Sequence, residues 1–90
     1  MRGLPPTPGE ITLPMLAAAF ATLTPRECEV LFWILHGKRD SEIAIILGIR
    51  ARTVSTHVCN LLGKLSVETR LAAAMEVVRV IICRRPAEGG

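Results

Sequence analysis

One segment of the 90-residue chain, ARTVSTHVCNLLGKL at residues 51–65, joins an apolar stripe to a polar face of unusual composition. Its apolar residues recur at helical spacing, so one face of a helix could be buried. The opposite face has small or hydrogen-bonding residues and one cation, namely Arg52, Ser55, Thr56, Cys59, Asn60 and Gly63. No Asp or Glu occurs from Arg50 to Val67. Such a face can approach a polyanion closely, because small side chains leave room and no carboxylate repels the anionic groups.

The residues that could support catalysis or bind a metal are too scattered to form a recognised site. Cys28, Cys59 and Cys83 include no C-x-x-C pair, and the two histidines complete no known ligand spacing. No glycine-rich phosphate loop or pair of carboxylates accompanies them. We therefore expect a protein that is not an enzyme and that holds no metal and no cofactor.

Charge and hydropathy narrow the class of partner. Between residues 36 and 70, six basic residues stand against three acidic ones, which favours a polyanionic partner. No apolar run reaches about 18 residues and no signal peptide is recognisable, so we expect a cytoplasmic protein with no membrane partner. An odd number of cysteines also fits a reducing compartment better than a disulfide framework.

Local signals predict a helix over residues 25–36 and a helix-turn-helix after it. Thr24, Pro25 and Glu27 form a capping-box pattern, and a glycine follows the last predicted residue of that helix. Asp40 can cap a second helix, SEIAIIL, which ends at Gly48, a residue free to adopt a left-handed conformation. Residues 48–50 then form the turn into the helix over 51–65, and two short helices so joined make a helix-turn-helix.

The rest of the chain completes an all-α domain. Residues 68–83 predict a fourth long helix, which Pro86 terminates, and residues 14–21 favour a short extra helix near the N-terminus. Residues 1–13 contain three prolines and two glycines, so we expect a flexible arm or linker there. The predicted division is thus an arm over 1–13, a domain over 14–85 and a disordered tail over 86–90.

Several separate motifs in this pattern resemble the LuxR/FixJ/GerE type of DNA-binding domain, along residues 23 to about 80. The matching residues are Leu23-Thr24-Pro25-Arg26-Glu27, Glu42-Ile43-Ala44, Leu47-Gly48-Ile49, Thr53-Val54, His57, Asn60, Lys64-Leu65, Val67 and Arg70. The resemblance implies four helices, with the helix over 51–65 in the major groove of double-stranded DNA and the last helix pairing two copies. It implies a bacterial transcriptional regulator.

The resemblance also implies a set of DNA-contacting residues. Ser55, Thr56 and Cys59 occupy places where similar proteins meet base edges, and the places of contact with phosphates or the groove edge are held by Arg52, Thr53, Asn60 and Lys64. Two of the base-facing places commonly hold Lys in the family and here hold Ser55 and Cys59. Arg39 and Arg50 stand where the family prefers a Ser cap, which costs about 1 kcal/mol each in capping but adds charge near the phosphates. We include both arginines as candidate phosphate contacts.

The last predicted helix has more apolar surface than one domain needs. One face, with Ala73, Ala74, Val77 and Ile81, suffices to pack against the domain. A second stripe is left over, with Arg79 at its edge, and comprises Leu71, Met75, Val78 and Ile82. Because small monomers rarely expose such a stripe, we expect a homodimer paired through this helix, although a second domain could cover the same surface.

A protein-interaction function remains an alternative to DNA binding. The chain could be a protein-interaction module that keeps the fold and binds another regulator through its apolar fourth helix. Proteins of this type often attach the domain to a receiver or a ligand sensor, and the 24 residues before Pro25 could hold neither.

Overall fold

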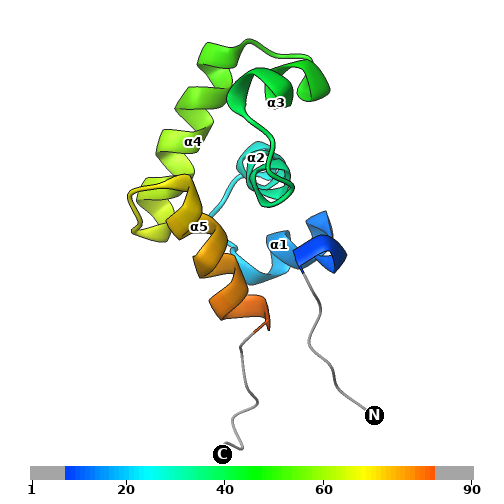
Figure 1. The fold of residues 1–90 in the computed structure, drawn as a ribbon. Helices are drawn as coiled ribbons and strands as arrows, with labels where there is room; N and C mark the ends of the chain where they lie inside the picture. The colour runs from blue at the N-terminus through cyan, green and yellow to red at the C-terminus, as the bar shows by residue number, and fades with distance from the viewer. Residues whose placement is uncertain (1–7, 83–90) are drawn as a thin grey trace, which may run out of the picture.

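A computed structural model describes residues 8–82 and shows an all-α fold, as predicted (Figure 1). Within that range there are five α-helices and no strand. The elements are η1 Pro8–Glu10, α1 Leu13–Ala19, α2 Pro25–Leu35, α3 Asp40–Leu47, α4 Ala51–Leu65, α5 Arg70–Val77 and the π-helical turn η2 Val78–Ile82, which continues α5. The fold therefore comprises the four expected helices and the extra N-terminal one.

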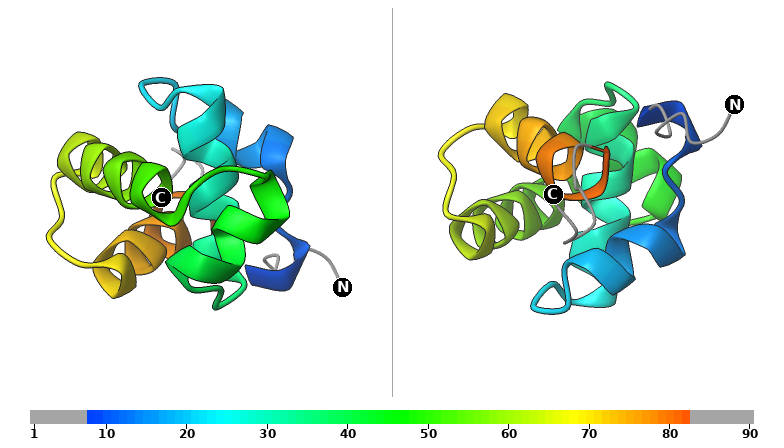
Figure 2. Two further views of the ribbon diagram at one scale, coloured as in Figure 1. Left: turned by 90° about the horizontal axis from the view of Figure 1, so that it is seen from above. Right: turned by 90° about the horizontal axis from the view of Figure 1, so that it is seen from below.

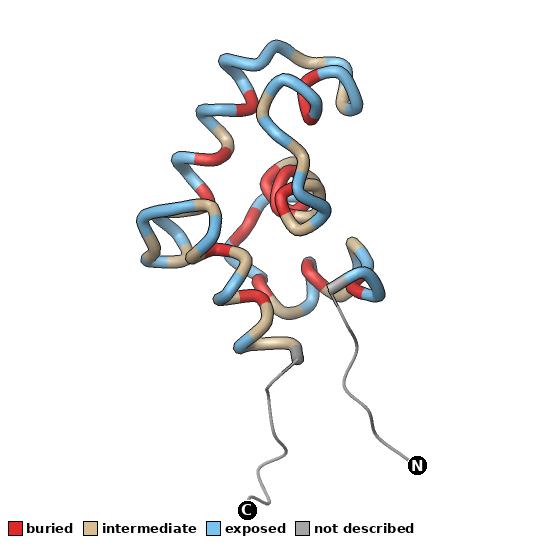
Figure 3. The backbone as a smooth tube through the Cα atoms, viewed as in Figure 1, coloured by how far each residue is buried: buried red, intermediate tan, exposed pale blue. Residues whose placement is uncertain are grey.

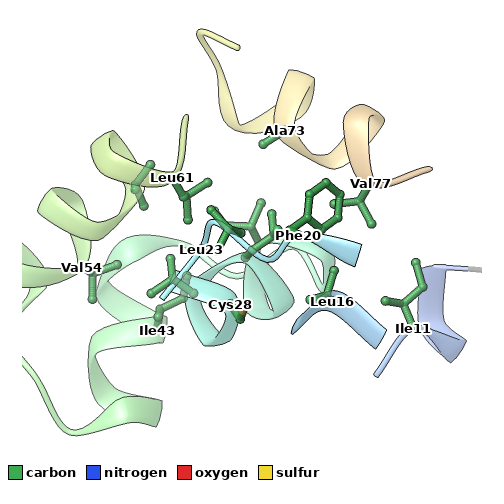
Figure 4. Close-up of a cluster of buried hydrophobic side chains, with 14 of the residues drawn as sticks. Ile11, Leu16, Phe20, Leu23, Cys28, Ile43, Val54, Leu61, Ala73 and Val77 are labelled. Atoms are coloured by element: carbon green, nitrogen blue, oxygen red, sulfur yellow. The ribbon is translucent and has the colours of Figure 1, made fainter. Parts of the chain in front are cut away.

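The second helix, α2, lies at the centre of the molecule, and Figure 1 shows it end-on among the others. The predicted capping box forms: the backbone N–H of Glu27 donates to Thr24 Oγ1 at 3.1 Å, and the N–H of Thr24 donates to Glu27 Oε1 at 2.9 Å. Val30 and Leu31 of α2 are fully buried, and the remaining helices contribute side chains around them (Figure 4). The core is almost entirely aliphatic.

Helices α3 and α4 form the helix-turn-helix and pack against each other, and the view from above in Figure 2 shows the turn that joins them. Gly48 ends α3 in the left-handed conformation, with φ 71°, and the N–H of Ile49 donates back to the carbonyl of Ala44 at 3.0 Å. Asp40, the cap predicted from the local pattern, is wrong, and Arg39, the cap position implied by the resemblance, is right. Arg39 is the N-cap residue, and its N–H donates to Glu42 Oε1 at 2.8 Å, whereas Asp40 is already helical.

The last helix differs from the prediction at its beginning and along its length. It begins at Arg70 rather than 68, because Thr69 is the N-cap and its Oγ1 accepts from the N–H of Ala72 at 3.0 Å. From Val78 to Ile82 it is π-helical rather than α-helical. A wider π turn rotates the following side chains about the axis, so an α-helical stripe cannot be extended unchanged past Val78. The predicted end at residue 83 lies outside the described residues.

Helix α1 packs on α2 and adds to the core from the side opposite the helix-turn-helix. Leu16 and Phe20 are buried, and so is Ile11, which is 1% exposed although we placed it in the arm. Thr12 caps this helix with Met15 as its reciprocal partner. Packing therefore begins before the domain boundary expected at residue 14, while residues 1–7 and the tail over 86–90 lie outside the described part.

Candidate nucleic-acid interface

The outward face of α4 has the composition that the sequence suggested. Val54, Val58 and Leu61 are buried where α4 packs against α2 and α3, which turns the polar face to solvent (Figure 3). The exposed residues of this face are Arg52, Thr53, Ser55, Thr56, Cys59, Asn60 and Lys64. We call this set the α4 face. Its side chains are short apart from Arg52 and Lys64, so the helix backbone could come close to a partner.

Three arginines that have no acidic partner among residues 8–82 lie at the first turns of α3 and α4. Arg39 and Arg50 are the N-cap residues of these helices, both are exposed, and neither side chain forms a capping hydrogen bond. The four ion pairs among residues 8–82 include none of Arg39, Arg50 and Arg52. The chain thus gives up two favourable caps and places uncompensated positive charge beside the α4 face.

Two residues that were not predicted from the sequence as site residues, Asp40 and Arg70, lie next to this face. Ser55 Oγ donates to Asp40 Oδ2 at 2.8 Å, and Arg70 at the start of α5 pairs with the other carboxylate oxygen of Asp40. Asp40 therefore links α3, α4 and α5 at one point instead of capping α3. Its partners are 15 and 30 residues away, and no local pattern signals either contact.

Lys64, a candidate phosphate contact, already has a partner inside the protein. Its Nζ donates to Glu27 Oε1 at 2.8 Å, and Glu27 is only 3% exposed. Burial disfavours the ionised carboxyl, but the hydrogen bonds from Lys64 and Thr24 outweigh it, so the pKa of Glu27 lies below its ordinary value. This ion pair fastens the end of α4 to the start of α2.

Removing this ammonium should destabilise the fold in a pH-dependent way. We expect Lys64→Met to lower the free energy of unfolding by about 1–2 kcal/mol, less than for a fully buried pair because the ammonium is partly exposed. In the wild type the unfolded chain binds a proton at Glu27 more readily than the folded chain does. The stabilisation is therefore present above pH 4.5 and is lost as the pH falls below it. The variant should lose most of this acid dependence.

Urea unfolding at neutral pH and below pH 4.5 would measure both effects. Arg26→Met is a matched control, because Arg26 pairs with Glu29 on the exposed side of α2. Such surface pairs contribute about 0.5 kcal/mol or less. Equal losses in the two variants would contradict a structural role for Lys64.

The predicted dimerisation stripe on α5 is exposed along its first part. Leu71 is 72% exposed and Met75 is 56% exposed, whereas Val78 is partly buried. Arg79 is exposed and pairs with Glu76 at 2.6 Å. Ile82 belongs to the π turn, and its side chain is outside the described part. The opposite face packs as expected, with Ala73 and Val77 fully buried.

The described part of the chain contains neither a candidate metal site nor a candidate membrane span. Residues 8–82 contain no group of three or more His, Cys, Asp or Glu placed to hold a metal ion. None of the helices described is both long enough and apolar enough to cross a membrane. The predicted site residues lie mainly on the α4 face, with Arg39 and Arg50 beside it, and on the α5 stripe.

Comparison with known families agrees with the helix-turn-helix geometry. The model of the family described as bacterial regulatory proteins, luxR family, matches residues 21–77. The chain belongs to this family. Membership makes it a helix-turn-helix domain of the DNA-binding transcriptional regulators, and it confirms the resemblance seen in the sequence. The match includes α2 to α5 and begins after α1.

Individual transcriptional regulators are similar over a comparable length of the chain. The transcriptional activator protein AnoR of Acinetobacter nosocomialis is 46% identical over 56 residues, which is 62% of this chain and 24% of that protein. The uncharacterized transcriptional regulatory protein YhcZ of Bacillus subtilis is 51% identical over 57 residues, 63% of this chain and 27% of the relative. The nitrate/nitrite response regulator protein NarP of Escherichia coli is 43% identical over 56 residues, which is 62% of this chain and 26% of that protein. The chain thus spans about a quarter of the length of these relatives.

Proposed function

We propose that the chain binds double-stranded DNA in a sequence-specific manner as part of a bacterial transcriptional regulator, with α4 in the major groove. The observation that supports this most directly is the α4 face, which is exposed, contains no acidic residue of α4 itself and consists mostly of short side chains. The one carboxylate brought to it, Asp40, is paired with Arg70. The major groove is about 12 Å wide and admits a helix only if its side chains do not hold it away. A cytoplasmic location follows from this partner.

The contacts within this proposal divide into two kinds. Arg39, Arg50 and Arg52 bind phosphates, since they are exposed and have no acidic partner among the described residues. Thr53 and Asn60 lie at the edge of the groove, and Lys64 contributes through its link to Glu27 more than through a phosphate. Base edges are met by the short side chains Ser55, Thr56 and Cys59, so readout relies on hydroxyl and thiol groups in place of long cations.

Two copies pair through α5 in this proposal. The exposed Leu71 and Met75 support it, because an apolar stripe of this kind on a small domain needs a cover. Val78, partly buried at the start of the π turn, and the exposed Arg79 border this stripe, and Ile82 is included in the proposed interface from the sequence pattern alone. A two-fold pairing would set two α4 helices about one turn of DNA apart, roughly 10 base pairs, and favour a site with inverted symmetry. A receiver or sensor domain supplies the input, in keeping with the greater length of the relatives.

The dependence of affinity on salt tests the phosphate contacts. With three arginines in each of two copies, the slope of log affinity against log salt should be about −5. Arg52→Gln should reduce its magnitude by about 2, because each dimer loses two contacts. Fluorescence anisotropy with a labelled duplex at several salt concentrations measures the slope. The matched control is Arg26→Gln, whose arginine is paired with Glu29 on α2 and should leave the slope unchanged.

A flat salt response of the wild-type protein would contradict DNA binding through these arginines. The alternative function, an interaction module that binds another regulator through α5, would then be favoured. A steep slope that Arg52→Gln leaves unchanged would place the phosphate contacts on other residues.

A further inference from the structure

The hydroxyl hydrogen of Ser55, on the α4 face, is committed to a residue of a different helix. Ser55 Oγ donates to Asp40 Oδ2 at 2.8 Å, and Arg70 occupies the other oxygen of the same carboxylate. A carboxylate paired with a guanidinium only accepts hydrogen bonds, so the hydrogen between Ser55 and Asp40 must belong to the serine.

The hydrogen bond to Asp40 determines whether Ser55 acts as a donor or as an acceptor toward a partner. A serine hydroxyl has one hydrogen and two lone pairs. With the hydrogen directed at Asp40, the group presents lone pairs outward and acts as an acceptor. Turning the hydrogen outward would forfeit a charge-assisted hydrogen bond at a carboxylate whose side chain is only 23% exposed.

The neighbouring hydroxyl, that of Thr56, also uses its hydrogen within the protein, but its acceptor is of a different kind. Thr56 Oγ1 donates to the carbonyl of Arg52, one turn earlier in α4, at 3.2 Å. Bonds of this type within a helix are common and are easily exchanged for another partner. The bond from Ser55 differs because it joins two helices and ends on a charged group.

Arg70 holds Asp40 in place for this role. Its guanidinium has the carboxylate of Asp40 as its ion-pair partner, while its Nη1 is buried and has no hydrogen-bond partner in the described part of the chain. The Asp40 side chain is thus held between Arg70 on α5 and Ser55 on α4. Arg70 acts on Ser55 through Asp40 and is a positioning residue.

We propose that Asp40 fixes Ser55 as a hydrogen-bond acceptor, and that Ser55 thereby selects a base amino group in the major groove. This inference rests on the proposed function, in which α4 enters that groove. The amino donors there are adenine N6 and cytosine N4, whereas guanine O6 and thymine O4 are acceptors. An acceptor hydroxyl bonds to adenine or cytosine at the contacted position and faces repelling lone pairs at guanine or thymine.

Selection of binding sites from random-sequence duplexes tests the inference. The wild type should show one position in each half-site at which adenine or cytosine is preferred over guanine or thymine by about 3- to 10-fold, the effect of one hydrogen bond. Ser55→Ala should lose the preference at this position and keep the others. Asp40→Asn should lose it as well, because an amide can also donate and no longer directs the serine hydrogen. Ser41→Ala, an exposed serine next to Asp40, is the matched control and should keep every preference.

The outcomes separate this inference from the proposed function. Thermal melting first checks that each variant is folded, and Ser55→Ala alters only an exposed side chain. If Ser55→Ala keeps every base preference, or if the position that depends on Ser55 favours guanine or thymine, the inference is wrong while DNA binding stands. If only Asp40→Asn keeps the preference, Asp40 does not direct the hydroxyl. If the wild type selects no sequence at all, the proposed function fails too.

Discussion

Thr56→Glu should abolish specific DNA binding and leave the helical content and thermal stability of the protein close to wild type. Thr56 is exposed in the middle of the α4 face, and its one hydrogen bond is to the backbone of its own helix. A carboxylate at this place would be desolvated against base edges and phosphates without a cationic partner. Such an unpaired charge costs at least about 3 kcal/mol, which is a loss in affinity of more than about 100-fold.

The comparison needs a variant with the same change of charge at another exposed threonine. Thr22→Glu serves this purpose, since Thr22 lies between α1 and α2 and outside both helices of the helix-turn-helix. We expect Thr22→Glu to lower the affinity for DNA by less than about threefold, which is the long-range effect of one screened charge. Anisotropy titrations give the affinities and circular dichroism gives the helical signal. Equal binding by Thr56→Glu and Thr22→Glu would refute the placement of α4 in the groove.

Met75→Glu should convert the proposed dimer into a folded monomer. Met75 is 56% exposed in the α5 stripe, so the change removes little from the core of a single copy. In a two-fold interface each copy contributes this residue, so two carboxylates would become buried without a cationic partner. We expect dimerisation to weaken by at least about 100-fold, because burying such charges costs several kcal/mol. Met75 is a cleaner test than Val78, which is partly buried and begins the π turn.

Sedimentation equilibrium over a range of concentrations gives the mass of each variant, and anisotropy gives its affinity for a full site and for one half-site. The monomer should bind one half-site weakly, and a full site should no longer increase its affinity as it does for the dimer. Ala18→Glu adds the same charge at an exposed position of α1 and should leave the dimer intact. If Met75→Glu keeps the wild-type dimer mass, the interface lies elsewhere on the molecule.

The sequence alone determined the helices and the outward face of α4. The capping box of Thr24 and Glu27 and the left-handed Gly48 were predicted and are present. The helix over 51–65 has the predicted bounds. These features could be predicted because caps, turns and helical periodicity depend on residues within about one turn of each other. Family membership could be recognised for a related reason, since its motifs are short and lie in a fixed register.

Only the tertiary structure decided how polar side chains of different helices are paired. Asp40 looked like a helix cap and instead joins Ser55 to Arg70, and Lys64 looked like a phosphate contact and is bonded to Glu27. These partners are separated by 15, 30 and 37 residues. The pairing of a charged side chain over such separations depends on which helices pack together and at what angle. Burial then determines the strength of the pair, since a carboxylate removed from water needs a close donor wherever in the chain that donor lies.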